Sequence, residues 1–404
     1  MRFHKNLVAG VSEVLNEIFV KGAYADKALE SLFRKNRRWG SRDRGFVAET
    51  VYDIVRWKRL YSEIGGIDSL VDEAGRYQLF AVWAILKGHP LPDWPEFKGI
   101  SFEKARERQV SLSEIRKYRE SVPDWLDELG ESSLGPEAWT RELAALNEQA
   151  PVILRANRLR TSPVALQVEL EKEGVTADLI PGYPDALQLR ERGNVFRTRA
   201  FQQGLFEVQD AASQTVAPFL GAQPGMRVID ACAGAGGKTL HLSALMENKG
   251  QLLAMDIYPG KLKELRKRAK RAGAHNIETR LITSSKVIKR LSDTADRILI
   301  DAPCTGLGVL RRNPDAKWKL QPDFVEKVCQ TQQDLLTQYC RMLKRGGKMV
   351  YATCSILPCE NQQQVDAFLN SEAGREFKVL RTRSLFPSGE GFDGFYMALL
   401  ERKG

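Results

Sequence analysis

Hydrophobic positions in the first hundred residues recur at the spacing of one helix face. The pattern runs over residues 7–19 and returns over residues 46–57 and 70–86. Apolar residues at every third or fourth position predict amphipathic helices. Pro90 then opens a series of three closely spaced prolines, which a helix interior does not tolerate. We therefore predict an all-helical first domain over residues 1–120.

The next part of the chain mixes two kinds of pattern. Short strand-like runs occupy residues 152–156 and 187–189, and a helical stretch over residues 164–172 lies between them. Alternation of short strands and helices over about a hundred residues is typical of a small α+β unit. We predict such a unit over residues 121–215.

The pattern of hydrophobic positions changes again near residue 216, where apolar runs alternate with helical stretches. The predicted strands are residues 227–230, 251–256, 297–301 and 348–353. Strands that alternate with helices favour an α/β fold with a parallel, doubly wound, Rossmann-like sheet. Ligands of such sheets bind beyond the carboxyl ends of the strands. Residues 216–404 are therefore predicted to form a catalytic domain.

Composition narrows the class of protein. The formal charge of +10 suits a polyanionic partner such as RNA, although a merely basic surface gives the same number. No run reaches the roughly 18–20 apolar residues that span a bilayer, so we expect a cytoplasmic protein without a membrane partner. The six cysteines form no C-x-x-C pair and the chain has four histidines, so we expect reduced thiols and no metal.

A glycine-rich loop at residues 230–239 follows the first strand of the predicted sheet. A phosphate-binding loop would need a glycine where Cys232 stands, and a dinucleotide loop would need one at Thr239. The remaining cofactor interpretation is a loop that holds the methionine part of S-adenosylmethionine. The alternative is a buried turn with a structural role only. Asp256 ends the second strand, where it would accept hydrogen bonds from ribose hydroxyls.

Two cysteines follow later strands of the sheet. Cys304 ends an Asp-Ala-Pro-Cys sequence that begins at Asp301, and Cys354 lies in a Thr-Cys-Ser sequence. A thiolate that adds to carbon 6 of cytosine makes carbon 5 nucleophilic, and a second thiol can help the later elimination. Asp301 could stabilise the intermediate, and Lys238 could favour a thiolate. The other cysteines are expected to serve packing instead: Cys232, Cys329, Cys340 and Cys359.

Residues 230–239, 301–306 and 353–355 together resemble the RsmB-like (Sun-type) RNA cytosine-5 methyltransferases. Further matching stretches are residues 208–210, 311–318 and 393–398. Near the start, residues 42–44 and 49–52 resemble the NusB-like helical domain of the ribosomal RNA members. The resemblance implies an S-adenosylmethionine-dependent enzyme that methylates carbon 5 of a cytosine in RNA through a covalent intermediate.

The resemblance also implies roles for single residues. The nucleophile of the family matches Cys354, and the cysteine that assists product release matches Cys304. The acid that contacts the base matches Asp301, and the lysine of the glycine loop matches Lys238. The residues assigned to the cofactor are Asp230, Cys232, Ala233, Gly234, Ala235, Gly236, Gly237, Lys238, Asp256, Ser284 and Asp301.

This chain departs from the family pattern at two places in the cofactor site. The loop usually reads Ala-Pro-Gly-Gly, but here it is residues 234–237, Gly-Ala-Gly-Gly. Without proline we expect a less rigid loop. An acidic residue usually follows the third strand to meet adenine, whereas Ser284 stands here between Thr283 and Ser285. We therefore expect a weaker hold on adenine.

Basic side chains suggest where RNA would lie. We expect phosphate contacts from Arg311, Arg312 and Lys317, because they follow the Pro-Cys loop closely. Further candidates are Arg37, Arg38, Arg42, Arg44, Arg155, Arg158 and Arg160. The basic run over residues 261–271 favours a solvated helix face. Ribosomal RNA is the favoured substrate and a monomer is expected. Transfer RNA or DNA as the substrate, and a non-catalytic RNA-binding assembly factor, remain the alternatives.

Overall fold

The computed structural model describes residues 3–98 and 101–404, which form two compact units. One unit, here called the helical unit, comprises Met1–Glu148 and Leu310–Pro322. The other, the α/β unit, comprises Gln149–Val309 and Asp323–Gly404. The predicted division into three domains at residues 120 and 215 stays a proposal, because compactness separates two units only.

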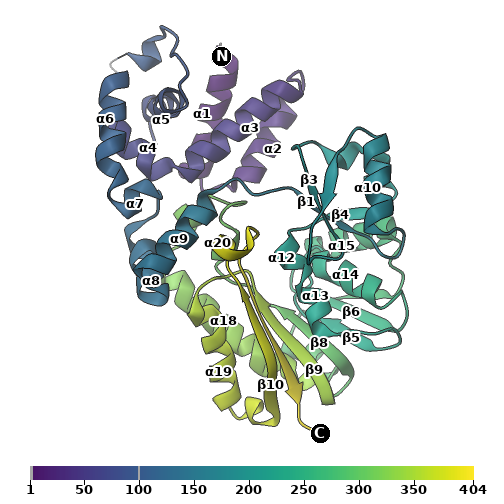
Figure 1. Ribbon diagram of the computed structural model, residues 1–404. Helices are drawn as coiled ribbons and strands as arrows, with labels where there is room; N and C mark the ends of the chain where they lie inside the picture. Colours follow the sequence, from purple (N-terminus) through teal and green to yellow (C-terminus); the bar gives the residue numbers. More distant parts are fainter. Residues whose placement is uncertain (1–2, 99–100) are drawn as a thin grey trace. The chain divides into compact units, whose positions relative to one another are not determined.

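The helical unit confirms the prediction of a helical N-terminal region (Figure 1). Its helices are α1 Lys5–Phe19, α2 Ala25–Lys35, α3 Ser41–Arg56, α4 Lys58–Gly65, α5 Glu73–Leu86, α6 Phe102–Ser113, α7 Arg116–Arg119, α8 Asp124–Leu134, α9 Pro136–Asn147 and α17 Ala316–Lys319. The apolar stripe of α1 is buried, with Val11 and Leu15 wholly covered. It packs in one core with Ile54 of α3 and Phe80 of α5. Burial of such faces, rather than local propensity, supplies most of the stability of helices.

The segment around α17 is fixed inside the helical unit by long-range hydrogen bonds. Trp318 Nε1 donates to the Val55 carbonyl oxygen at 2.7 Å. Arg311 is buried and donates to the Ala145 carbonyl oxygen at 2.9 Å, near the end of α9. Lys317 is also buried, and burial lowers its pKa to about 7. The prediction that Arg311 and Lys317 contact substrate phosphate is therefore wrong, because both side chains are enclosed by their own unit.

The α/β unit begins with a four-stranded antiparallel sheet. Its strands are β1 Ile153–Ala156, β2 Ala177–Leu179, β3 Ala186–Leu189 and β4 Phe206–Val208, in the order β2-β3-β1-β4. Helix α10 Pro163–Lys172 covers one face and buries Leu166 and Leu170 there. The predicted small α+β unit is thus present.

A seven-stranded sheet forms the main body of the α/β unit. Its strands are β5 Arg227–Asp230, β6 Gln251–Asp256, β7 Ile277–Leu281, β8 Ala295–Asp301, β9 Leu343–Thr353, β10 Phe377–Leu385 and β11 Phe395–Arg402, in the order β10-β11-β9-β8-β5-β6-β7. The four predicted strands lie in β5, β6, β8 and β9, which pair in parallel. The sheet is mixed rather than wholly parallel, because β11 runs antiparallel to both β9 and β10. This is a Rossmann-like fold.

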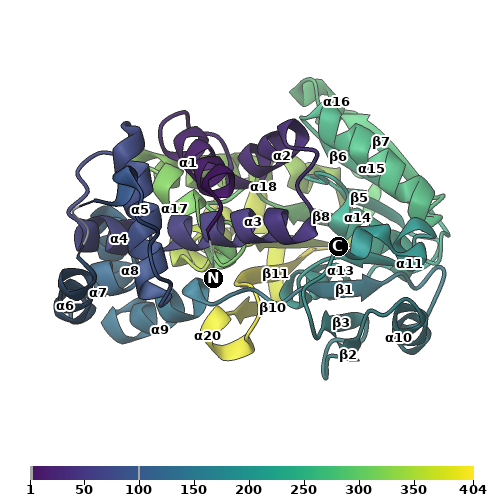
Figure 2. The same ribbon diagram turned by 90° about the horizontal axis from the view of Figure 1, so that it is seen from above.

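Helices cover both faces of this sheet (Figures 1 and 2). On one face lie α13 Val216–Leu220, α14 Gly237–Leu245 and α15 Pro259–Ala272. On the other lie α16 Ser285–Lys289, α18 Pro322–Tyr339 and α19 Gln362–Asn370. Within β6, Leu252 packs towards the first face and Leu253 towards the second. This alternation, with both faces covered, is why the strand is apolar throughout.

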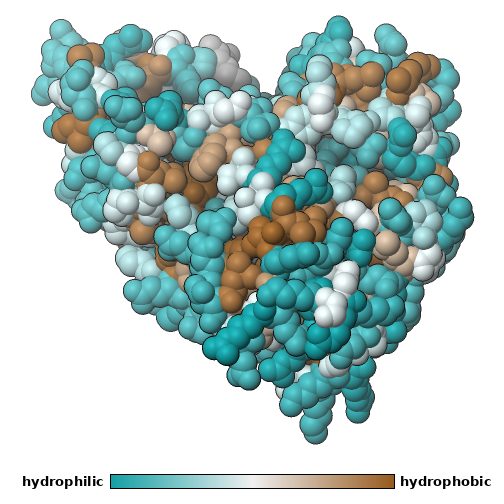
Figure 3. Space-filling view, turned by 60° about the horizontal axis from the view of Figure 1, so that its bottom comes forward, coloured by the Kyte–Doolittle hydropathy of each residue, from teal (hydrophilic) through white to brown (hydrophobic). Residues whose placement is uncertain are grey.

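Hydrophilic side chains prevail on the face seen in Figure 3, and hydrophobic ones gather there in several patches, one of them near the centre of the view. In the part of the chain that the structure describes, no helix combines the length and the apolar character needed to cross a membrane.

Candidate active site

The two thiols lie side by side at one edge of the large sheet. Cys304 follows β8 and Cys354 follows β9, and these parallel neighbours end at the same edge, with Asp301 opposite Ala352. The Sγ atoms of Cys304 and Cys354 are 3.4 Å apart. The hydrogen bond with Cys354, together with burial, raises the pKa of the Cys304 thiol well above its usual range. The two thiols can therefore share one proton.

An ion pair adjoins the thiols. Lys238 Nζ, at the start of α14, lies 2.7 Å from Oδ2 of Asp301, at the end of β8. The ammonium also lies 5.1 Å from the centre of the Phe395 ring. Burial lowers the pKa of Lys238, but the Asp301 carboxylate and then the Cys354 thiol outweigh it, so that the pKa is raised overall. A lysine that remains charged is thus held beside the thiol of Cys354.

The glycine loop turns sharply between β5 and α14. Gly234 has φ of +54° and Gly236 has φ of +91°, a left-handed region that favours glycine. A Cβ atom at Gly236 would lie 2.6 Å from Leu265 Cγ, so no larger residue fits there. A Cβ atom at Gly234 or Gly237 would meet no atom within 4 Å. The loop therefore leaves open space at the sheet edge where its backbone can approach a ligand.

Two aspartates lie at this opening. Asp230 is buried, and Thr239 Oγ1 donates to its Oδ2 at 2.7 Å, while Oδ1 has no hydrogen-bond partner. Burial raises the pKa of the Asp230 carboxyl to about 7. Asp256, at the end of β6, accepts from the backbone N–H of Gly234 and of Tyr258, each at 2.8 Å. A buried acceptor without a partner is costly, so Asp230 suits a ligand that brings a donor or a positive charge.

The remaining predicted cofactor residues differ in exposure. Ala233 is buried, and its N–H donates to the Met255 carbonyl oxygen at 2.9 Å. Cys232, within the loop, packs against the hydrophobic core, and burial raises the pKa of its thiol well above the usual range, so packing suits it better than chemistry. Ser284 is exposed where α16 begins. Ile257, which directly follows Asp256, is 57% exposed, although it is apolar.

A network of buried and partly buried charges supports the glycine loop from the small sheet and α15. Arg155 of β1 donates to the Gly237 carbonyl oxygen at 2.7 Å. Arg268 of α15 donates to the Ala235 carbonyl oxygen at 2.9 Å and pairs with Glu207 of β4 at 2.9 Å. The prediction of an RNA contact for Arg155 is wrong, because its side chain is buried against this loop.

Two residues of this site were not predicted. Arg268 belongs to a basic run that reads as a solvated face, so nothing in its local sequence marks it. Glu360 was visible only as part of a Pro-Cys-Glu-Asn sequence, yet its side chain is wholly buried between the two thiol loops. A glutamate in an apolar surrounding so close to Cys354 was the available signal, because charged residues are rarely fully buried without partners.

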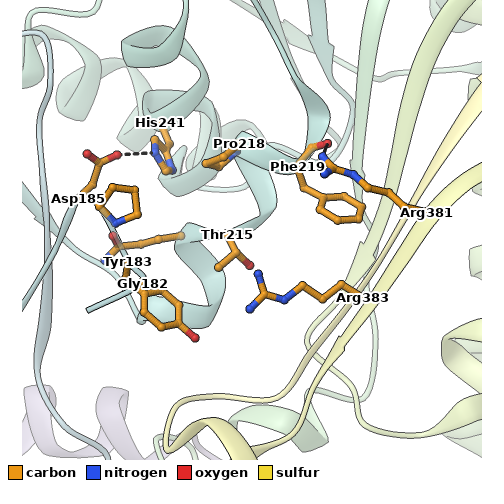
Figure 4. Close-up of a pocket in the computed structure, with 11 residues that line it drawn as sticks. Gly182, Tyr183, Asp185, Thr215, Pro218, Phe219, His241, Arg381 and Arg383 are labelled. Atoms are coloured by element: carbon orange, nitrogen blue, oxygen red, sulfur yellow. Dashed lines mark hydrogen bonds and ion pairs between the residues drawn. The ribbon is translucent and has the colours of Figure 1, made fainter. Parts of the chain in front are cut away.

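A separate pocket of about 250 Å³ lies between the small sheet, α13 and β10 (Figure 4). Asp185 Oδ2 lies 3.2 Å from His241 Nε2 on its wall. Burial, and then the charge of Arg155, lower the pKa of His241 to about 4, so the imidazole is neutral near pH 7. The lining residues include none of the predicted site residues. Across residues 3–98 and 101–404, no cluster of three His, Cys, Asp or Glu side chains could hold a metal.

A Rossmann-like mixed sheet with a glycine loop after its first strand and an aspartate after its second is typical of S-adenosylmethionine-dependent methyltransferases. Comparison with known proteins gives the family. Residues 217–401 match the family described as 16S rRNA methyltransferase RsmB/F, and residues 122–196 match its ferredoxin-like domain. The chain belongs to the RsmB/F family of RNA methyltransferases.

Individual relatives agree with this assignment. The "Probable ribosomal RNA small subunit methyltransferase B" of Synechocystis sp. is 32% identical, over 96% of this chain and 98% of its own length. Among solved structures, PH0851 has a TM-score of 0.82 at 25% identity, with 100% of both chains covered. NSun6 from Pyrococcus horikoshii has a TM-score of 0.65 at 21% identity, over 71% of this chain and 100% of its own. The last similarity shows the fold alone.

Proposed function

We propose that this protein methylates carbon 5 of a cytosine in small-subunit ribosomal RNA, with Cys354 as the nucleophile. The observation that carries the proposal is the pair of thiols, 3.4 Å apart, beside the Lys238–Asp301 ion pair. Carbon 5 of cytosine is a poor nucleophile, and covalent addition at carbon 6 is the chemistry that activates it. A cysteine beside a held ammonium is suited to that addition, since the cation favours the thiolate.

Each side chain then has one task. The Cys354 sulfur forms a bond to carbon 6, and the electron pair of the 5,6 double bond moves to carbon 5. Asp301, whose Oδ2 lies 2.7 Å from Lys238 Nζ, hydrogen-bonds the edge of the ring and stabilises the intermediate. After methylation, loss of the carbon 5 proton to water re-forms the double bond and expels the Cys354 thiolate. The S–H group of Cys304 donates a hydrogen bond to the departing sulfur, which makes it a better leaving group.

We infer that the methyl donor is S-adenosylmethionine, which supplies an electrophilic methyl group when bound. The unpartnered Oδ1 of Asp230 suits the cationic methionine end, and the open space at Gly234 and Gly237 lets the backbone approach it. Asp256 would accept from the ribose, and the exposed face of Ile257 offers adenine an apolar contact in place of an acid near Ser284. The NSun6 structure of the same fold contains SFG, an S-adenosylmethionine analogue.

The choice of ribosomal RNA rests on the relatives, whose names refer to the small ribosomal subunit. The target cytosine must leave any base stack to reach Cys354, so we propose an unpaired or flipped nucleotide as the substrate. We further propose that the helical domain and the small α+β domain bind RNA.

Trapping on modified RNA tests the proposal. Small-subunit RNA that contains 5-azacytidine should form a stable adduct with the protein, because nitrogen at position 5 prevents the elimination that frees the enzyme. Cys354→Ala should abolish the adduct and Cys304→Ala should keep it. Loss in Cys304→Ala with retention in Cys354→Ala would assign the nucleophile as in DNA cytosine-5 methyltransferases. A methylation product other than 5-methylcytosine in wild-type digests would overturn the proposed function.

A further inference from the structure

Glu360 is a wholly buried carboxylate that lies between the two thiol loops. Its Oε2 accepts from the backbone N–H of Thr305 at 2.8 Å and from Gln332 Nε2 at 3.2 Å. Its Oε1 accepts from Thr305 Oγ1 at 2.5 Å and from the hydroxyl of Ser355. Four donors match the four lone-pair positions of an ionised carboxylate.

The direction of the hydroxyl hydrogen bonds follows from their other partners. The N–H of Leu307 donates to Thr305 Oγ1 at 3.4 Å, and the N–H of Leu357 donates to Ser355 Oγ at 3.2 Å. A hydroxyl that already accepts from a backbone N–H is free to donate its own proton to a carboxylate. Both hydroxyls therefore donate to Glu360.

These contacts fix the residue that directly follows each thiol. Thr305 follows Cys304 and Ser355 follows Cys354, so one side chain ties together the loops that follow β8 and β9, beside the backbone hydrogen bond from Gly308 N–H to the Cys354 carbonyl oxygen. Asn361 strengthens the tie, since its Nδ2 donates to the Ser355 carbonyl oxygen at 2.9 Å. The 3.4 Å separation of the thiols is therefore held by a buried polar network rather than by the strands alone.

The charges around the two thiols are unequal. After the hydrogen bond to Cys354, burial and the charge of Cys354, the carboxylate of Glu360 adds to the rise in the pKa of Cys304. On the other side, the ammonium of Lys238 is coupled to Cys354. Glu360 binds the residue that follows each thiol, but its charge acts on Cys304 while that of Lys238 acts on Cys354. This inequality favours a proton on the first thiol and a negative charge on the second.

We propose that Glu360 is a positioning residue, whose buried carboxylate ties the two thiol loops together and keeps the shared proton on Cys304, so that Cys354 is the thiolate. This inference rests on the proposed function, because it explains why Cys354 attacks and why Cys304 is available as a hydrogen-bond donor. No bond to Glu360 forms or breaks in the reaction.

The pH dependence of alkylation of the full-length protein shows which of the two thiols loses its proton more readily, here called the thiol order. The measurement needs neither RNA nor cofactor. Iodoacetamide rates are followed peptide by peptide in Cys304→Ala and in Cys354→Ala, which separates two thiols that otherwise titrate together. Cys354 should be alkylated faster than Cys304 at the same pH. Adding Glu360→Gln should move the Cys304 profile down by about one unit and the Cys354 profile by less.

Control variants separate the proposed effect of Glu360 from general effects of substitution. Glu390→Gln removes another hydrogen-bonded carboxylate of the α/β unit, bound to Tyr183 and not to a thiol loop, and should leave both profiles unchanged. Glu360→Asp keeps the charge and should restore most of the thiol order. Should Glu360→Gln not fold, Thr305→Val can replace it, because it removes one donor to the carboxylate. It should narrow the difference between the alkylation profiles of Cys304 and Cys354, but by less than the loss of the Glu360 charge would.

Two outcomes would overturn the inference. One is a Cys304 profile that does not move in Glu360→Gln while the unfolding temperature stays that of the wild type. The other is an equal movement of both thiols, which would indicate a general structural role. Neither outcome depends on methylation. A failed RNA assay would overturn the proposed function only, and the measured difference in reactivity between Cys304 and Cys354 would still test the role of Glu360.

Discussion

Arg268 donates a hydrogen bond to the carbonyl oxygen of Ala235, 2.9 Å away, and so fixes the glycine loop at the position where related loops carry proline. The sequence without proline predicts a loosened loop, because proline restricts the backbone and alanine does not. Arg155 holds the next part of the loop through the Gly237 carbonyl oxygen. The buried guanidinium of Arg155 and the partly buried one of Arg268 thus restrain a loop whose own sequence does not.

Arg268→Gln should therefore weaken cofactor binding. Loss of a charged hydrogen bond costs about 1.5–3 kcal/mol, so we expect the Kd for S-adenosylmethionine to rise by about tenfold or more. Calorimetry on the full chain measures this. Arg266→Gln, an exposed neighbour on the same helix bound to Thr279, is the matched control and should bind as the wild type does. Equal affinity in Arg268→Gln would show that the loop needs no such support.

Lys238→Gln should slow methylation far more than it weakens RNA binding. The ammonium pairs with Asp301 and interacts with Cys354, so its loss removes favourable electrostatics from addition to carbon 6. We expect kcat to fall on the order of 100-fold, with KM for RNA nearly unchanged. A loss confined to KM would instead assign Lys238 to substrate binding.

Much of the site follows from the sequence through the geometry of parallel strands. Apolar runs that end in Asp230 and Asp256 coincide with β5 and β6. Because the carboxyl ends of parallel strands meet at one edge, Cys304 and Cys354 were expected close together, and they are neighbours. Their roles stay proposals, since an edge position does not say which thiol attacks.

The sequence does not reveal which charged side chains are buried. Arg155, Arg311 and Lys317 read as surface cations, yet each is enclosed by groups distant in the sequence. Arg311 donates to a backbone carbonyl near the end of α9, and no pattern in the local sequence predicts this hydrogen bond. Strand β10 was missed for a related reason, because its exposed edge position admits charges such as Arg383 that hide its period.

The ionisation of Asp230 should make cofactor binding pH-dependent. Burial raises the pKa of this carboxyl to about 7 in the free protein, although the hydrogen bond from Thr239 opposes the rise. A cationic ligand favours the ionised form, so below about pH 7 binding must release a proton. Affinity should rise with pH up to about 7 and then level off. Calorimetry in buffers of different ionisation enthalpy should detect the proton, and Asp230→Asn should abolish its release.

The same raised pKa has a consequence for stability without cofactor. A carboxyl whose pKa is higher in the folded than in the unfolded state contributes stability at low pH and loses it as pH rises to the folded value. Asp230→Asn should therefore stabilise the free protein above about pH 7 relative to the wild type, and the difference should shrink towards pH 4. Thermal unfolding across this range measures it. A difference independent of pH would assign the effect to packing.

The adenine contact proposed for Ile257 can be separated from effects of surface charge. Ile257 is 57% exposed beside Asp256, and Val164 on α10 is 59% exposed in the small α+β unit. Ile257→Asp places a carboxylate where an apolar face would cover the base and should raise the Kd for S-adenosylmethionine by about tenfold. Val164→Asp adds the same charge to an equally exposed position and should change nothing. Methionine alone should bind both variants equally, since it lacks the base. Equal affinity for S-adenosylmethionine in the two variants would contradict the contact between Ile257 and adenine.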